Sequence, residues 1–112
     1  INENCKMKKT LKILSEKKLG LLVVRNKRKF TSGLIVDGDV KRANQKYKSL
    51  HDLSVKDIMT KNPLSVDKDM FAAQCLDIMN SKRITSLLVH ENNNKNKTIG
   101  VLHIHKVLEN IK

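Results

Sequence analysis

The apolar residues of this 112-residue chain occur twice in the same order, and this repetition limits the fold more than any other feature of the sequence. Met7, Leu11, Leu14, Leu19, Leu22 and Val24 recur 65 positions later as Ala72, Leu76, Met79, Ile84, Leu87 and Val89. After a polar turn the spacing becomes 67, as Gly33 and Gly100 show, so the second turn is two residues longer. Insertions of this kind belong in surface turns. A match that continues through five successive elements indicates a tandem repeat.

Apolar spacing and turn residues predict the elements of each repeat. Apolar side chains at i, i+4 and i+7 predict a helix, short apolar runs predict strands, and Asn62-Pro63 ends a short helix because proline disfavours helix in the residue before it. The predicted order is a helix over 7–18, strands over 21–24 and 30–36, a helix after Asp37-Gly38-Asp39, a short helix over 54–59, a strand over 64–66, a helix capped by Asp67, strands over 87–90 and 99–104, and a terminal helix that buries Val107, Leu108 and Ile111.

Each repeat is therefore an α/β unit of strand, helix, strand, strand and helix with a small three-stranded sheet, and a pseudo-twofold axis relates the two. We expect the first repeat over residues 1–48, a linker over 49–54 and the second repeat over 55–112. Residues 1–6 offer nothing similar to the strand over 64–66, so the first repeat is predicted to lack its leading strand. An incomplete first repeat suggests that the chain is part of a longer protein.

Charge and composition argue against several classes of protein. The net charge is +12, but the positive residues are spread along the chain, 19 are lysines against 4 arginines, and only three aromatic residues are present for stacking on bases. Nucleic-acid binding is therefore not expected. No apolar run approaches the roughly 20 residues of a membrane-spanning helix, so no membrane partner is expected either. Cys5 and Cys75 suggest neither a disulfide framework nor a zinc cluster, and a cytoplasmic location follows.

Several segments resemble the tandem cystathionine-β-synthase (CBS) domain pair, or Bateman module. They are VKDIMTKNPLSV over 55–66, KRITSLLV over 82–89 and the two glycine-led corners, GLIVDGDVKR over 33–42 and GVLHIHKVLE over 100–109. In combination they look like the C-terminal regulatory pair of arabinose-5-phosphate isomerases, which serve synthesis of the lipopolysaccharide sugar acid Kdo. The resemblance implies that the isomerase chemistry belongs to a separate sugar-isomerase domain, and no catalytic residue or cofactor is expected in this chain.

The resemblance also implies a nucleotide in the cleft between the repeats. Members of that family carry glycine, two apolar residues, Ser or Thr, two further residues and then Asp: the hydroxyl donates to a phosphate and the carboxylate accepts from the ribose diol. In the first repeat Asp39 takes the acidic position, beside Asp37, but Val36 takes the place of the hydroxyl. A phosphate there loses a hydrogen bond worth about 0.5–1.5 kcal/mol.

The second repeat departs further from the family pattern. His103 replaces the hydroxyl residue, and Lys106 reverses the charge of the acid, which suits a carboxylate or a phosphate. His105 shares a strand face with His103, and Thr85 and Ser86 precede the neighbouring strand, where they could face the cleft. The predicted ligand is thus a nucleotide or a nucleotide-linked sugar acid, such as CMP-linked Kdo, in an asymmetric cleft.

Simpler interpretations stay open for the same residues. The role of Asp39 could be limited to capping a helix, and the hydroxyls of Thr85 and Ser86 could belong to a turn. A zinc site at His103 and His105 lacks a third ligand. For the module as a whole, the family implies a homodimer, and a tetramer in a full-length isomerase. The alternatives are an oligomerisation module without a ligand and, less consistent with the composition, a basic nucleic-acid-binding domain.

Overall fold

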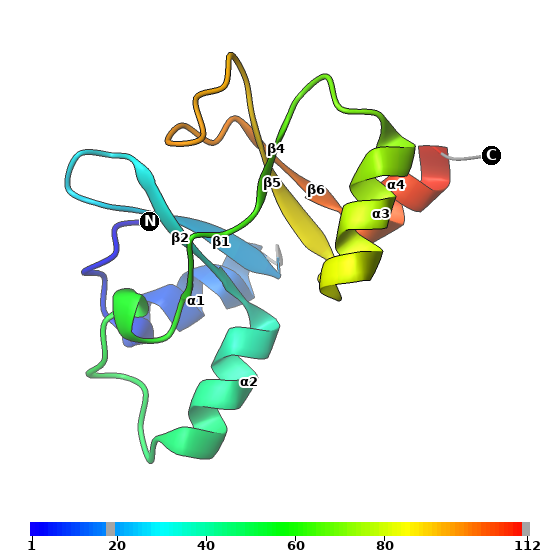
Figure 1. The fold of residues 1–112 in the computed structure, drawn as a ribbon. Helices are drawn as coiled ribbons and strands as arrows, with labels where there is room; N and C mark the ends of the chain where they lie inside the picture. Colours follow the sequence, from blue (N-terminus) through cyan, green and yellow to red (C-terminus); the bar gives the residue numbers. More distant parts are fainter. Residues whose placement is uncertain (18–19, 111–112) are drawn as a thin grey trace. The chain divides into compact units, whose positions relative to one another are not determined.

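Each half of the chain folds around its own small sheet in the computed structural model, which describes residues 1–17 and 20–110 (Figure 1). Residue contacts divide the chain into two compact units, Ile1–Asn62 and Pro63–Lys112, here called unit 1 and unit 2. Helices and two three-stranded sheets confirm the α/β class and the two-repeat architecture. The repeat boundaries at 48 and 55 stay a prediction, because the compact units follow spatial contacts rather than sequence similarity.

Unit 1 places its helices against a sheet of order β1-β2-β3, in which β2 is antiparallel to both neighbours. Met7, Val24 and Ile35 are fully buried where helix and sheet meet, and burial of each such side chain stabilises the fold by about 1.5–3 kcal/mol. The elements of this unit are α1 (Met7–Lys17), β1 (Leu21–Arg25), β2 (Thr31–Val36), α2 (Asp37–Lys46), the 3₁₀ helix η1 (Val55–Asp57) and β3 (Thr60–Lys61).

Unit 2 has the sheet order β4-β5-β6, with β5 parallel to β4 and antiparallel to β6. Its core forms where α3 and α4 cover the sheet, around Met79, Leu87 and Val107. The elements are β4 (Ser65–Asp67), α3 (Ala72–Lys82), β5 (Ser86–His90), β6 (Gly100–His103) and α4 (Ile104–Asn110).

The spacings of 65 and 67 hold residue by residue in the structure. The bounds of α3 and β5 are those of α1 and β1 plus 65, and α4 begins 67 residues after α2. Strand register repeats as well: Leu21 pairs with Val36, and their counterparts Ser86 and His103 pair in the same way. Residues that are equivalent in the two sequence repeats therefore also pair in the same strand register.

The start of the chain does not form a named strand, yet it carries the end of a leading strand. Asn2 makes an isolated parallel bridge to Arg25, as Asp67 pairs in parallel with His90 in unit 2. The Glu3 nitrogen donates to the Arg25 carbonyl at 2.8 Å, and the Lys68 nitrogen donates to the His90 carbonyl at the same distance. The prediction that residues 1–6 resemble nothing in the second repeat is corrected to this extent. Backbone pairing leaves no apolar pattern by which it could be seen in the sequence.

Other predictions about element ends need correction. Asp67 ends β4 instead of capping a helix, and Phe71 is the N-cap residue of α3. Leu108 is half exposed rather than inward-facing, whereas Val107 is buried as predicted and Ile111 lies outside the described residues. Strand β3 was not predicted, since its two residues are exposed and show no apolar pattern.

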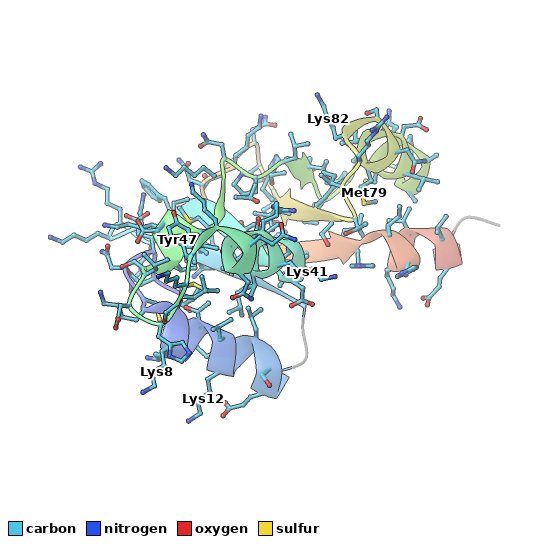
Figure 2. The ribbon with its side chains drawn as sticks, turned by 90° about the horizontal axis from the view of Figure 1, so that it is seen from below. Lys8, Lys12, Lys41, Tyr47, Met79 and Lys82 are labelled. Carbon is cyan, nitrogen blue, oxygen red and sulfur yellow. The ribbon has the colours of Figure 1, made fainter. Side chains whose placement is uncertain are left out.

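Lysines on the helices account for much of the chain's positive charge. Lys8, Lys12, Lys41 and Lys82 are exposed, whereas Met79 is fully buried (Figure 2). Among the described residues, no helix is both long enough and apolar enough to cross a membrane.

Gly33 and Gly100 are equivalent in the repeats but have different surroundings. A Cβ at Gly33 would lie 2.9 Å from the backbone oxygen of Thr60 and would also meet the Met59 side chain. A Cβ at Gly100 would meet only the Val89 Cβ, at an ordinary 3.9 Å. Close pairing of β2 with β3 therefore requires glycine in unit 1 but not in unit 2.

We predict that Gly33→Ala destabilises the chain by about 1–3 kcal/mol, because the methyl group has no space beside a fixed backbone. Gly100→Ala is expected to be neutral or to stabilise by up to about 1 kcal/mol, since alanine restricts the unfolded chain more than glycine does. Urea unfolding followed by circular dichroism measures both. Equal unfolding midpoints for the two variants would contradict the close approach of the Thr60 backbone in β3 to Gly33 in β2.

Candidate functional site

Five of the residues that the sequence singled out gather in unit 2 where β5 begins and β6 passes into α4. Ser86 and His103 are opposite each other in the antiparallel pair, and the Ile104 nitrogen donates to the Thr85 carbonyl at 2.8 Å. The first turn of α4 supplies the other two. This group, the basic corner, consists of Thr85, Ser86, His103, His105 and Lys106.

The strand residues of the basic corner lie on the sheet face that turns away from α3 and α4. Leu87 and Leu102 belong to the core beneath those helices. Side chains alternate along a strand, so the neighbouring Ser86 and His103 point to the opposite face. Opposite residues of an antiparallel pair have Cβ atoms about 4.5–5.5 Å apart, which places the hydroxyl and the imidazole within reach of one ligand group.

The two histidines of the basic corner are in contact. Their rings stack with centroids 4.9 Å apart and an interplanar angle of 27°, and the His105 backbone nitrogen donates to His103 Nδ1 at 3.2 Å. With Nδ1 accepting, the proton of a neutral His103 sits on Nε2, which can act as a donor. The Lys106 amine lies 3.5 Å from the Glu109 carboxylate, and both side chains are about two-thirds exposed. Exposed ion pairs of this kind contribute about 0–1 kcal/mol, so a bound anion can compete for the amine.

Unit 1 has the same corner with different side chains. The Asp37 nitrogen donates to the Gly20 carbonyl at 3.3 Å, the counterpart of the bond from Ile104 to Thr85. Glycine and apolar residues replace the hydroxyls and the imidazoles. This group, the acidic corner, consists of Gly20, Leu21, Val36, Gly38 and Asp39.

Asp39 is 5% exposed, and other residues of unit 1 occupy both of its carboxylate oxygens. Oδ2 accepts from the Val36 backbone nitrogen at 2.9 Å, which holds the first turn of α2. Oδ1 accepts from Arg42 Nη2 at 2.7 Å and from Thr60 Oγ1 at 2.9 Å. The structure thus supports the helix-capping interpretation of Asp39, and its predicted contact with a ribose would require one of these bonds to open.

The predicted site residues therefore fall into two groups. The structure brings Thr85, Ser86 and His103 together in unit 2, with His105 and Lys106 beside them. In unit 1, Val36 is half-buried, Asp37 is exposed and Asp39 is engaged internally. Whether these eight residues bind a ligand stays a prediction.

Sequence reasoning missed the partners of Asp39 and a buried polar pair in unit 2. Arg42 follows Asp39 by three residues on one helix, a spacing that could have indicated an ion pair. Thr60 lies 21 residues away and left no signal. In unit 2 the Ser65 hydroxyl and Nδ1 of the buried His90 share a hydrogen bond between β4 and β5. These groups are structural, because they link elements of one unit.

Residues 1–17 and 20–110 contain no group of three or more His, Cys, Asp or Glu side chains that could hold a metal ion. Cys75 is 3% exposed in the core of unit 2, and burial raises the pKa of its thiol. Cys5 is partly exposed. The described residues form the two repeats alone and include no separate catalytic domain.

The sequence profile of the CBS domain family matches residues 55–112, more than half of the chain. The chain therefore belongs to the CBS domain family, and its two equivalent units make it a CBS domain pair.

Two curated relatives align over 108 residues, 96% of this chain. An uncharacterized protein of Rickettsia prowazekii is 32% identical, and the arabinose 5-phosphate isomerase KdsD of Escherichia coli is 28% identical. The chain spans about a third of the length of these relatives, 32% in both cases. A similar solved structure is a CBS domain protein of Pyrobaculum aerophilum complexed with AMP, with a TM-score of 0.81 and 21% identity over 95% of this chain and 79% of that one.

We predict that Asp39→Asn destabilises the chain by about 1.5–3 kcal/mol, because it weakens three hydrogen bonds to a buried carboxylate. Asp37→Asn is the matched control: this side chain is exposed in the first turn of α2, so its loss is expected to cost less than about 1 kcal/mol. Chemical denaturation measures both. Similar stabilities of the two variants would contradict the structural role of Asp39.

Proposed function

We propose that this CBS domain pair is a regulatory module that senses a nucleotide and holds the nucleotide's phosphate at the basic corner of unit 2. The observation that supports the proposal is the pairing of Ser86 with His103, on whose ring His105 stacks. The Thr85 backbone is joined to the start of α4, and Lys106 lies in the first turn of that helix. No carboxylate belongs to that group, although Glu109 forms an exposed ion pair with Lys106.

The chemistry of these groups suits a phosphate. Hydroxyls of Thr85 and Ser86 can donate hydrogen bonds, as can Nε2 of His103. The Lys106 amine adds a charge-assisted bond, which is shorter and roughly twice as strong as a neutral one.

The bound AMP of the Pyrobaculum aerophilum protein supports a nucleotide as the class of ligand. Similarity to the KdsD isomerase supports a finer alternative, in which the ligand is a nucleotide-linked sugar acid such as CMP-linked Kdo and the pair regulates an arabinose-5-phosphate isomerase. Both ligands carry a phosphate next to a ribose, so the same corner would serve either. A homodimer stays a prediction from the family resemblance, and a tetramer is predicted only for the full-length isomerase of this finer alternative.

A purely structural module without a ligand is the second candidate. The acidic corner favours it, because hydrogen bonds within unit 1 occupy both carboxylate oxygens of Asp39. In addition, the Val36 side chain offers no hydrogen-bond donor to a phosphate. This observation concerns unit 1 alone and leaves the basic corner available.

Calorimetric titration tests the proposal with AMP and CMP-linked Kdo in separate arms. At least one of them is expected to bind, and Lys106→Ala is expected to weaken that binding about tenfold, equivalent to about 1.4 kcal/mol. Lys106→Arg should restore most of the affinity, since it returns the charge.

Lys82→Ala is the matched control, because Lys82 is an exposed lysine of α3 outside the basic corner. Its effect on affinity should stay within about twofold, as for a screened surface charge. Absence of heat with either nucleotide at millimolar concentration would support the structural candidate. Equal losses with Lys82→Ala and Lys106→Ala would refute the assignment to this corner.

A further inference from the structure

The turn that joins β1 to β2 carries a cluster of positive charge, and Figure 1 shows this turn projecting beyond the sheet of unit 1. The group, here called the basic turn, consists of Arg25, Lys27, Arg28, Lys29 and Phe30, all of them exposed. Two of the chain's four arginines belong to it, although lysines outnumber arginines 19 to 4 in the whole chain. Guanidinium groups can bind a carboxylate through two parallel hydrogen bonds, so the turn differs in chemistry from the lysines spread over the helices.

The four cations of the basic turn are not neutralised within the chain. None of the ion pairs among residues 1–17 and 20–110 involves them. The equivalent turn of unit 2 has Asn92 and Asn93 after Glu91, and the Glu91 carboxylate pairs with the Lys68 amine at 3.2 Å. An excess of unpaired positive charge is therefore a property of this turn and is not imposed by the repeat.

Asn26 fixes the backbone of the basic turn. Its nitrogen donates to the Phe30 carbonyl, and the Lys29 nitrogen donates to the Asn26 carbonyl, both at 2.9 Å. The Asn26 side-chain oxygen accepts from the backbone nitrogens of Arg28 and Phe30 at 2.9 and 3.1 Å. Lys29 has a φ of 65°, the left-handed conformation for which such three-residue loops use glycine. A side chain in this conformation costs free energy, so folding stability does not account for the lysine.

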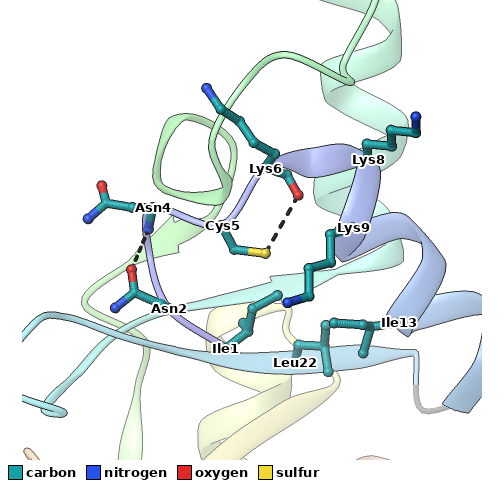
Figure 3. A pocket seen from close by; sticks show the side chains of 9 residues that line it. All are labelled: Ile1, Asn2, Asn4, Cys5, Lys6, Lys8, Lys9, Ile13 and Leu22. Carbon is teal, nitrogen blue, oxygen red and sulfur yellow. Dashed lines mark hydrogen bonds between the residues drawn. The ribbon is translucent and has the colours of Figure 1, made fainter.

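The basic turn lies away from the start of the chain. Figure 3 shows Ile1 beside Leu22, where both line a pocket next to α1. Asn2 pairs in parallel with Arg25. Any residues before Ile1 would therefore run along β1 toward its first residue, in the direction opposite to the turn.

We propose that the basic turn binds an acidic segment of a partner protein. Carboxylates of the segment pair with the four cations, and an apolar side chain of the segment covers Phe30, which is 42% exposed. Nucleic acid is a poorer occupant, since Phe30 is the one aromatic residue of the turn on which a base could stack. A membrane surface is also poorer, because a single apolar side chain gives only marginal anchoring. A second copy of this chain would oppose the turn with its net charge of +12.

NMR titration of the ¹⁵N-labelled chain at low ionic strength tests the proposal, because exposed charges are little screened there. The probe is the acetylated, amidated peptide DELDE, and its matched control is NQLNQ, which keeps the shape and removes the charges. Pentathymidylate offers the same number of negative charges on phosphates, and phosphatidylserine vesicles offer an anionic lipid surface.

DELDE is expected to cause saturable shifts of the amide resonances of residues 25–30, and NQLNQ is not. Arg28→Glu should weaken the binding of DELDE about fivefold or more, because it replaces an exposed charge contact with a repulsion. Lys41→Glu changes the total charge equally at an exposed position of α2 and should leave the affinity within about twofold. Lys29→Gly should raise the urea midpoint and yet weaken binding about threefold, since it removes both the backbone strain and a charge contact.

Equal shifts with the two peptides, equal effects of Arg28→Glu and Lys41→Glu, or an unchanged affinity of Lys29→Gly for DELDE would overturn the proposal. Tighter binding of pentathymidylate or of the vesicles than of DELDE would overturn it in favour of nucleic acid or a membrane. Resonances of the basic corner are followed separately in the same spectra, so none of these outcomes depends on nucleotide binding there.

Discussion

The antiparallel pairing of two strands in each unit fixes where every candidate site residue lies. Pairing of β1 with β2 and of β5 with β6 follows one register, and in each unit a backbone hydrogen bond from the first residue of α2 or α4 closes the corner. Side-chain direction has a period of two along a strand, so a slip of one residue would exchange the side chains that face the core with those that face away from it. Leu87 and Leu102 hold this register by their burial, and Ser86 and His103 are thereby turned to the opposite face.

On this common frame, the two corners have acquired different chemistry. Unit 1 uses Asp39 to connect α2, β2 and β3 through three hydrogen bonds, and the close approach of β3 in turn requires Gly33. Unit 2 has Lys106 at the equivalent position, exposed and beside two stacked histidines. The same fold position therefore serves internal cohesion in one repeat and presents positive charge in the other.

Much of this arrangement could be predicted from the sequence, because burial leaves a periodic apolar pattern. The repeat spacing anticipated most of the helices and strands, and the family resemblance assigned Thr85, Ser86 and His103 to one predicted cleft. Contacts made by backbone atoms or by distant polar groups left no such pattern: the bridge of Asn2 to Arg25 uses only the main chain, and Thr60 reaches Asp39 across 21 residues. Whether an acid binds a ligand or caps a helix depends on those contacts, so the sequence left both roles of Asp39 open.

The central claim is that the corner of unit 2, and not that of unit 1, receives a phosphate. Amide chemical shifts of the ¹⁵N-labelled chain test it most directly, because they report on both corners in one experiment. The ligand is whichever of AMP and CMP-linked Kdo binds in calorimetry. The account predicts saturable shifts at residues 85–86 and 103–106 that exceed those at 36–39. Larger shifts at 36–39, with residues 103–106 unchanged, would contradict it.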